Sequence, residues 1–256
     1  SSYPGAAIWC RGGRLRPDVE AGIDMEVWEI SKNDFNAITA DYPGLRNFLT
    51  EIVAERFATS RMTAERQIGK YLITDIIGRG GFSIVYKGLH RRLNMPVAIK
   101  MLNHDMAMDK EFVSNFQKEA ITIAQFNHDN IIKVYDVESR YQTMFIVMEL
   151  VQGSSLREIM NDRGPLPLDQ VVRYLLQVCA GLHYAHERDV IHQDIKPGNL
   201  LLDVDGRLKI VDFGLAHLDQ PGPAITMTGE LLGTPAYMSP EQAMARRAVV
   251  DHRTDI

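Results

Sequence analysis

Three polar side chains that could carry out chemistry lie between residues 192 and 214. The chain reads His-Gln-Asp-Ile-Lys-Pro-Gly-Asn over 192–199, and Asp-Phe-Gly follows at 212–214 after a short strand-like run. Phosphoryl transfer needs an acidic group that accepts or orients the proton of the nucleophile, together with oxygen ligands for a divalent cation. The types and spacing of Asp194, Asn199 and Asp212 match that need and indicate phosphoryl-transfer chemistry.

A glycine-rich segment upstream could hold the phosphates. Residues 76–86 read Ile-Ile-Gly-Arg-Gly-Gly-Phe-Ser-Ile-Val-Tyr, so backbone amides between two β-type runs could approach a triphosphate without an intervening Cβ. By itself, a GxG between strands is more often a hairpin turn. Residues 97–100, Val-Ala-Ile-Lys, then form an alternating strand that ends in a cation, and a predicted amphipathic helix carries Glu119. Alone, this lysine and glutamate could equally be a surface pair that contributes little.

Residues 233–241, Gly-Thr-Pro-Ala-Tyr-Met-Ser-Pro-Glu, complete a series of motifs that occur in one order. The series over residues 71–256 resembles the serine/threonine protein kinases, especially bacterial ones with a Gly-Gly in the phosphate loop. The resemblance implies an α+β, two-lobe protein-kinase-like fold. We expect an antiparallel-sheet N-lobe with one helix over about 71–148, and a mainly helical C-lobe over about 152–256 that is truncated at its C-terminal end.

Local patterns predict several elements of that fold. One helix is expected over Lys110 to Phe126, and another begins at a capping box formed by Ser155 and Glu158. A third is expected over Asp169 to Glu187. Its apolar stripe is predicted to be core and consists of Val172, Leu175, Leu176, Cys179, Leu182 and Tyr184.

The resemblance also implies a role for each motif residue. Lys100, fixed by Glu119, would bind the α and β phosphates of ATP, and Lys196 would neutralise charge on the γ phosphate. Asp194 would accept or orient the proton of the substrate hydroxyl, whereas Asn199 and Asp212 would hold Mg²⁺. The remaining positions expected around ATP are Ile77, Gly78, Gly80, Gly81, Ser83, Val85, Ala98, Met148, Glu149, Val151 and Leu201.

Four further sets of residues are expected to support the reaction. The hinge at 148–151 would bind adenine through its backbone, and His192 would pack under Phe213 in a structural role. Lys196 and Thr234, the latter contacting Asp194, favour serine or threonine substrates. Thr226 and Thr228 have the Thr-x-Thr arrangement that bacterial kinases autophosphorylate.

Three positions depart from the family pattern. Ser83 replaces the third glycine of the phosphate loop, and Ser239 stands where alanine is usual. Gln193 replaces the arginine that normally pairs with an activation-loop phosphate. Glutamine cannot supply that charge-assisted, bidentate contact, so the usual receiver of the phosphate is absent.

Residues 1–66 call for a separate interpretation, with the kinase domain beginning at residue 67. A strand is predicted over 24–30, a short capped helix over 31–40 and a long linker helix over 43–66. One face of the long helix carries Leu45, Phe48, Leu49, Ile52, Val53 and Phe57. This order resembles the C-terminal end of a cyclic-nucleotide-binding domain, although the phosphate-binding cassette is not intact. The simpler alternative, a helix that packs on whatever precedes it, is favoured.

Composition sets the remaining limits. The 256 residues carry a net charge of -5, which gives no nucleic-acid footprint, and no apolar run is long enough to span a bilayer. Without a secretory leader pattern, a cytoplasmic location is the expectation, and two cysteines form no disulfide framework.

The sequence thus favours a kinase that uses ATP and Mg²⁺, acts on serine or threonine of protein substrates in signal transduction, and carries remains of a cyclic-nucleotide-binding domain. The alternatives are an ATP-binding pseudokinase or scaffold, and a sensor protein with a kinase output.

Overall fold

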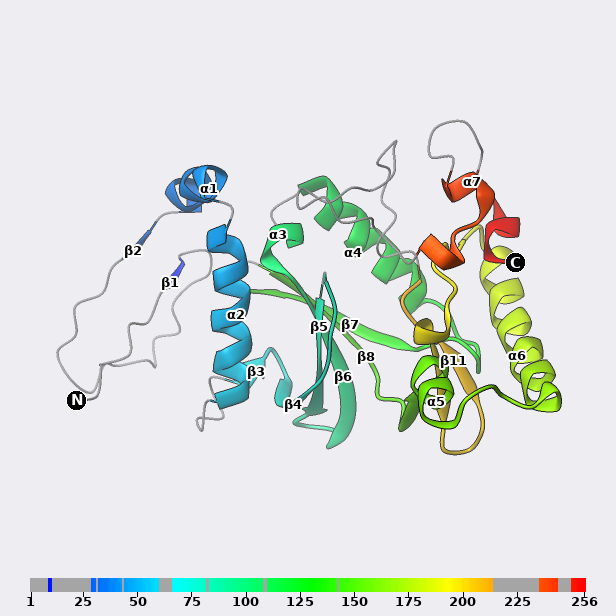
Figure 1. Ribbon diagram of the computed structural model, residues 1–256. Helices are drawn as coiled ribbons and strands as arrows, with labels where there is room; N and C mark the ends of the chain where they lie inside the picture. Colours follow the sequence, from blue (N-terminus) through cyan, green and yellow to red (C-terminus); the bar gives the residue numbers. More distant parts are fainter. Residues whose placement is uncertain are drawn as a thin grey trace.

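The structure is a computed structural model. It describes residues 9–10, 29–30, 32–42, 44–59, 66–81, 83–107, 110–141, 143–213, 235–243 and 250–256. The described parts form an N-terminal lobe built on a β-sheet and a C-terminal lobe built mainly of helices (Figure 1). The expected α+β, two-lobe fold is therefore confirmed.

A six-stranded antiparallel sheet forms the N-lobe, in the order β3-β4-β5-β6-β8-β7 (Figure 1). The strands are β3 (Gln67–Ile68), β4 (Tyr71–Arg79), β5 (Ser83–His90), β6 (Met95–Leu102), β7 (Val134–Arg140) and β8 (Thr143–Glu149). Every residue of β6 from Val97 onward is buried, and so are the first six residues of β8. Such continuous burial in the middle of a sheet means that both of its faces are covered.

Two helices cover the two faces. Helix α4 (Lys110–Ala124), with the short α3 (His104–Ala107) before it, packs against one face, where Ala98 and Ile146 belong to the same apolar cluster as Phe116. The residues next to these in each strand, such as Val97 and Val147, lie on the other face and cluster with helix α2 (Gly44–Thr59). This division follows from the two-residue period of side chains along a strand.

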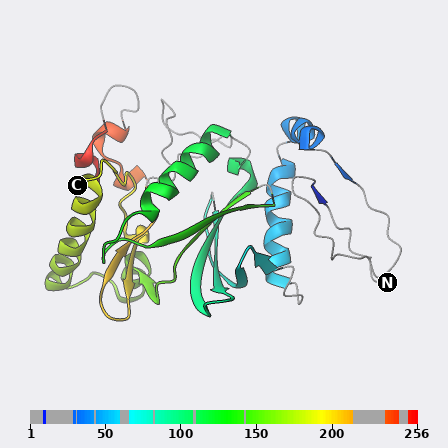
Figure 2. The ribbon, with the colours of Figure 1, turned by 180° about the vertical axis from the view of Figure 1, so that it is seen from behind.

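The position of α2 corrects the favoured interpretation of the N-terminal segment. The helix packs on the sheet that follows it in sequence, where Ala54 and Phe57 are buried, and not only on what precedes it (Figures 1 and 2). The predicted apolar face was wrong at Phe48, whose side chain is 57% exposed. At the predicted start of the kinase domain, Gln67 and Ile68 form strand β3, and Ile68 is fully buried.

Little of the first 31 residues is described. Strands β1 (Trp9–Cys10) and β2 (Glu29–Ile30) pair in parallel, and α1 (Lys32–Asp41) follows close to the predicted bounds. Residues 24–28 of the predicted strand and 60–65 of the predicted long helix lie outside the described residues. Among the helices that the structure describes, none combines the length and apolar character needed to cross a membrane.

The C-lobe places two helices beside a small sheet. Helix α5 (Leu156–Arg163) begins with the predicted capping box, in which Ser155 accepts from the backbone of Glu158 and Glu158 accepts from the backbone of Ser155. Helix α6 (Leu168–His186) lies within one residue of its predicted bounds. The sheet order is β11-β10-β9, formed by β9 (Gly153–Ser155), β10 (Leu200–Asp203) and β11 (Leu208–Ile210). The remaining short helices are η2 (Pro197–Asn199), η3 (Pro235–Tyr237), α7 (Pro240–Ala243) and η4 (His252–Asp255).

The predicted core stripe of α6 was largely wrong. Val172, Leu175 and Leu176 are 48%, 54% and 66% exposed, and Cys179 is exposed as well. The buried residues of α6 are Val178, Gly181, Leu182 and Ala185, which follow the helical spacing along a neighbouring face. That face lies against β11, where a Cβ on Gly181 would come within 2.8 Å of the Ile210 side chain.

Candidate active site

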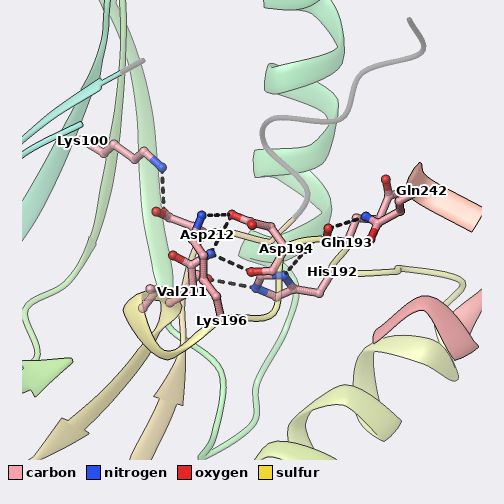
Figure 3. Close-up of polar contacts among 9 residues, drawn as sticks. Lys100, His192, Gln193, Asp194, Lys196, Val211, Asp212 and Gln242 are labelled. Atoms are coloured by element: carbon pink, nitrogen blue, oxygen red, sulfur yellow. Dashed lines mark hydrogen bonds and ion pairs between the residues drawn. The ribbon is translucent and has the colours of Figure 1, made fainter. Parts of the chain in front are cut away.

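Two strands from different lobes bring a cation and a carboxylate together. Lys100 lies in the buried part of β6, and Asp212 follows β11 by two residues. The Nζ atom of Lys100 donates to Oδ1 of Asp212 at 2.7 Å (Figure 3). Burial acts to raise the pKa of Asp212, but the neighbouring Lys100 ammonium outweighs it and holds that pKa below its ordinary value. Asp212 is therefore ionised at neutral pH.

A second polar cluster surrounds Asp194. Its Oδ2 atom accepts from Lys196 Nζ at 2.7 Å and from Asn199 Nδ2 at 2.9 Å. Asn199 also donates to the backbone oxygen of Asp194 at 2.8 Å, and the 3-10 turn Pro197–Asn199 sets this approach. The loop thus holds the Asp194 carboxylate in fixed relation to the Asn199 amide and to the ammonium of Lys196. The Asp194 and Lys196 side chains are drawn in Figure 3.

His192 contacts the backbone next to both polar clusters, at Val211 and at Asp194. It is fully buried, and its ring lies 4.6 Å from the ring of Phe213, as predicted. Its Nε2 atom lies 3.0 Å from the carbonyl oxygen of Val211, and Nδ1 lies 3.2 Å from the amide nitrogen of Asp194. Burial lowers the pKa of His192, so the imidazole is neutral. A neutral ring protonated on Nε2 satisfies both contacts, because Nε2–H donates and Nδ1 accepts.

Asp255 is a supporting residue that the motif analysis missed. From the far end of the chain, its buried carboxylate accepts from the backbone nitrogens of His192 at 2.8 Å and Gln193 at 2.7 Å. His186 Nε2 lies 2.7 Å from the same carboxylate. No local pattern around 255 could reveal this role, because its partners lie more than 60 residues earlier.

Gln242 is a second missed residue. Its Nε2 atom donates to the backbone oxygen of Gln193 at 2.6 Å, while its Oε1 accepts from the backbone of Ser239 at 3.0 Å (Figure 3). The residue after the Ser-Pro-Glu motif therefore connects that motif to residues 192–199, the predicted catalytic loop. The contact uses the backbone of Gln193, so it does not depend on which side chain stands there.

Two residues of the site adopt left-handed backbone conformations. The φ angles of Gln193 and Asp212 are 65° and 61°. Non-glycine residues seldom adopt this region, and each costs about 1–3 kcal/mol when the surroundings enforce it. At Gln193 the amide donates to Asp255 and the carbonyl oxygen accepts from Gln242, and at Asp212 the carboxylate accepts from Lys100; these hydrogen bonds hold the two residues in place.

The glycine-rich turn lies open between β4 and β5. The amide of Gly80 donates to the Ser83 oxygen at 2.8 Å, which closes the turn. None of Gly78, Gly80 and Gly81 has a left-handed φ, and a Cβ built on any of them would meet nothing closer than 3.6 Å. Packing among the described residues therefore does not require these glycines, which is consistent with space kept for a ligand that approaches the backbone.

Apolar residues predicted around adenine gather in one cluster between the lobes. Ala98 pairs with Met148 across β6 and β8, and both are buried in the cluster. Val85, Val151 and Leu201 pack against the same cluster, whereas the side chain of Ile77 is 51% exposed.

The side chain of Glu149, in the predicted hinge, is hydrogen-bonded to two partners. Its Oε2 accepts from Lys209 Nζ at 3.0 Å and from the backbone nitrogen of Lys133 at 3.3 Å. Next to this pair, the amide of Ile132 donates to the oxygen of Ile210 at 2.9 Å. Strand β11 is thereby joined to the N-lobe. The amide of Glu149 also donates to the oxygen of Lys133 at 2.8 Å, so neither this N–H nor Oε2 is free for a nucleotide.

Some predicted site residues cannot be placed. Thr226, Thr228 and Thr234 lie outside the described residues. Glu119 lies in α4, but its side chain is not among those described, so its pairing with Lys100 stays a prediction.

Comparison with known proteins agrees with this geometry. The family described as protein kinase domain matches residues 71–256. Serine/threonine-protein kinase PknL of Mycobacterium tuberculosis is 42% identical over 187 residues, which cover 73% of this chain and 46% of PknL. Serine/threonine-protein kinase PknB of Mycobacterium leprae is 37% identical over 191 residues, covering 73% of this chain and 30% of PknB. The chain thus spans less than half the length of these curated relatives.

A solved structure extends the likeness to three dimensions. The crystal structure of the Mycobacterium tuberculosis PknI kinase domain superposes with a TM-score of 0.60 at 30% identity, covering 74% of this chain and 70% of that one. Sequence, fold and site geometry together place this chain in the protein kinase family, among serine/threonine kinases of the bacterial type.

Proposed function

We propose that this chain transfers the γ-phosphate of ATP to serine or threonine hydroxyls of a protein substrate. The observation that carries the proposal is the Lys100–Asp212 contact of 2.7 Å, which joins the two lobes. The Lys196–Asp194 pair supplies a second cation and a second carboxylate. Phosphoryl transfer depends on positioning and charge neutralisation more than on covalent chemistry. A site that holds two cations and two carboxylates in a fixed frame suits that task.

Each residue then has a defined part. Asp194 would orient the substrate hydroxyl and accept its proton, and Lys196, already 2.7 Å from that carboxylate, would neutralise charge on the transferring phosphate. Lys100 would bind the α and β phosphates. The open glycine-rich turn, residues 78–83, would contact the phosphates through its amides. The hinge, with its Glu149 side chain bound to Lys209, would recognise adenine through backbone groups alone.

The donor set also fits Mg²⁺. Asp212 is ionised and 36% exposed at its side chain, and Asn199 spends its amide nitrogen on Asp194, so its oxygen is the atom suited to a cation. Carboxylate and amide oxygens are hard ligands of the kind this ion prefers. When bound, Mg²⁺ would neutralise the phosphates and bridge them to these two residues.

The test is transfer of radiolabelled phosphate from ATP to serine, threonine and tyrosine peptides. Asp194→Asn should keep ATP binding while lowering kcat by roughly 10² to 10⁴, the range for loss of a positioned proton acceptor. Asp205→Asn makes the same chemical change at an exposed position of the β10–β11 turn and should leave kcat unchanged.

Three outcomes would count against the proposal. Equal turnover in Asp194→Asn and the parent chain would remove Asp194 from the reaction. ATP binding without any transfer in the parent chain would favour the pseudokinase or scaffold alternative. Transfer to tyrosine peptides alone would contradict the assigned substrate class.

We also propose that residues 1–66 belong to a regulatory domain related to cyclic-nucleotide-binding domains. The support is the predicted order of strand, short helix and long helix, of which β2, α1 and α2 are the described parts. The family match begins only at residue 71, so this assignment rests on the sequence pattern. Titration of the chain with cyclic AMP and cyclic GMP tests this assignment. If neither nucleotide changes the kinase rate or gives a heat of binding, the assignment is contradicted.

A further inference from the structure

Helix α2 presents three buried residues to the N-lobe sheet at helical spacing. Thr50, Ala54 and Phe57 are 4%, 0% and 1% exposed. Positions four and seven residues apart lie on one side of a helix, so these three form a single contact face. The ring of Phe57 meets the rings of Tyr86, Tyr141 and Phe145 edge-on at centroid distances of 5.5, 5.9 and 6.3 Å. The aromatic contacts anchor one end of that face on the sheet.

The other end of the face carries a hydrogen-bond network. The Oγ1 atom of Thr50 accepts from the backbone nitrogen of His104 at 3.0 Å and lies 3.0 Å from the Nδ1 atom of the same residue. The Nε2 atom of His104 lies 2.8 Å from the carbonyl oxygen of Tyr141. That oxygen can only accept, so Nε2 carries the proton, and Nδ1 of the neutral ring is an acceptor. The single proton of the Thr50 hydroxyl has two acceptors in reach, Nδ1 at 3.0 Å and the carbonyl oxygen of Arg46 at 3.3 Å. The Thr50 hydroxyl therefore contacts two groups of one buried histidine.

His104 stands where several parts of the nucleotide site meet. It is the first residue of α3, which leads into α4, the helix that bears Glu119. Its neighbour Asn103 donates from Nδ2 to the backbone oxygen of Gly81 at 2.8 Å, which holds the tip of the glycine-rich turn. The junction between β6 and α3 thus connects α2 to the turn and to α4.

A second contact runs from α2 to the same turn. Glu51, the residue after Thr50, lies 3.3 Å from the guanidinium of Arg79 at the end of β4. Both side chains are about half exposed or more, so this pair alone stabilises little. Its position nevertheless shows that α2 reaches the β4 end of the glycine-rich turn directly, while Asn103 contacts the turn at Gly81.

We propose that Thr50 of α2 is a positioning residue for the nucleotide site. Through His104 it fixes the β6–α3 junction, and through Asn103 that junction fixes the glycine-rich turn. The inference rests on the proposed function, because the turn is taken to bind ATP. It predicts that docking of α2 changes the affinity for ATP more than it changes recognition of the protein substrate.

The first test separates positioning from general stability. Thr50→Val keeps the shape of the side chain and removes the hydroxyl, leaving two buried polar groups of His104 without that partner. We expect KM for ATP to rise about tenfold, the size expected for one lost buried hydrogen bond. KM for the peptide should stay within about twofold of the parent value, since the described contacts of the network run to the glycine-rich turn and to Tyr141, and not to Asp194.

Two matched variants make the result specific. Thr50→Ser restores the hydroxyl and should return KM for ATP to within about twofold of the parent chain. Val178→Ala removes a buried group of α6, far from the network, and should lower the melting temperature without raising KM for ATP. The inference is overturned if Thr50→Ser fails to rescue, or if Thr50→Val and Val178→Ala change KM alike.

A second measurement needs no substitution. Coupling between two sites is reciprocal, so ATP with Mg²⁺ should slow hydrogen exchange both at the glycine-rich turn, residues 78–83, and at the amides of His104 and of α2 residues 50–57. Amides of α5 serve as the control. Protection of the turn without protection of α2 would overturn the inference and leave the proposed function standing. No protection at the turn itself would overturn the proposed function.

Discussion

The carboxylate of Asp255 lies 2.8 Å from the backbone nitrogen of His192, a residue 63 positions earlier in the chain. A second backbone nitrogen, that of Gln193, donates to the same side chain. The last described turn therefore fixes the start of the catalytic loop, and the left-handed conformation of Gln193 depends on a side chain that has no part in the motif.

The first prediction concerns this support. Asp255→Asn keeps the size of the side chain but replaces one acceptor oxygen by a donor, leaving a buried backbone N–H unpaired. We expect the free energy of unfolding in urea to fall by about 1–3 kcal/mol, with a parallel fall in kcat. Asp169→Asn, which breaks only an exposed pair with Arg173, should change the free energy by no more than about 0.5 kcal/mol. Equal stability of the two variants would show that Asp255 does not hold the loop.

The second prediction concerns Asp212, the proposed metal ligand. Asp212→Asn removes the charge that faces Lys100, so binding of ATP at saturating Mg²⁺ should weaken together with turnover. Binding of ATP without Mg²⁺ should change much less, because the lost oxygen acts on the cation. Titration calorimetry at both Mg²⁺ levels provides the measurement. Identical losses under the two conditions would mean that Asp212 serves Lys100 and not a metal.

The third prediction concerns pH. Burial lowers the pKa of His192 below its ordinary 6.5, against the opposing charges of Asp255, Asp194 and Asp212. The unfolded chain then binds the proton more readily, so stability is full above pH 6.5 and falls as pH drops through the window between the unfolded and folded pKa values. One proton corresponds to a slope of about 1.4 kcal/mol per pH unit.

Urea unfolding between pH 5 and 7.5 measures that slope. His192→Gln should flatten it, whatever its own effect on stability, while His183→Gln at an exposed position should not. A slope that survives in His192→Gln would assign the proton to another group.

The fourth prediction concerns α2 as part of the N-lobe core. Phe57→Ala should lower the free energy of unfolding by about 3–5 kcal/mol, the usual loss for a buried phenylalanine. Phe48→Ala truncates the same residue type in the same helix, but at a position 57% exposed, and should cost at most about 0.5 kcal/mol. Similar small losses in both variants would show that α2 does not belong to the folded lobe.

The fifth prediction concerns activation. A phosphate on Thr226 or Thr228 adds about -1.5 to -2 charge, and Gln193 cannot pair with it as an arginine would. Because Gln242 already holds the backbone of Gln193, the chain should be partly active without phosphorylation. Replacing both threonines by alanine should lower the initial rate only modestly, whereas Gln193→Arg should make the rate depend more strongly on phosphorylation. Complete loss of activity in the double alanine variant would show that another cation receives the phosphate.

The sequence predicted the parts of this molecule whose information is local. The catalytic loop, the Ser155 capping box and the bounds of α4 and α6 follow from motifs and periodicity, and the structure has them within about two residues of the predictions. Contacts between distant segments were not predictable in the same way. Asp255 and Gln242 bind backbone atoms of the loop. Every residue has these atoms, so the contacts leave no sequence pattern at His192 and Gln193.

The two errors about helices have one cause. Periodicity predicts that a helix has an apolar side, but it does not say what covers that side. Leu175 and Leu176 were assigned to the core on periodicity alone, although the described residues of α6 that reach β11 lie along the neighbouring face. The partner of α2 was likewise misassigned, because Ala54 and Phe57 carry no mark of which sheet they contact.

The bonds that join β11 to the N-lobe have a mechanical consequence. Lys209 pairs with Glu149, and the amide of Ile132 donates to the oxygen of Ile210. Any opening of the two lobes that keeps these two bonds must therefore rotate about the place where they join β11 to the N-lobe. Asp212 is two residues from the pivot and is displaced little. Strands β4 and β5 are separated from β8 by β6, so we expect the glycine-rich turn between them to move further than Asp212 in such an opening. Nucleotide entry and exit would then depend on motion of the turn, while the proposed metal ligand keeps its place.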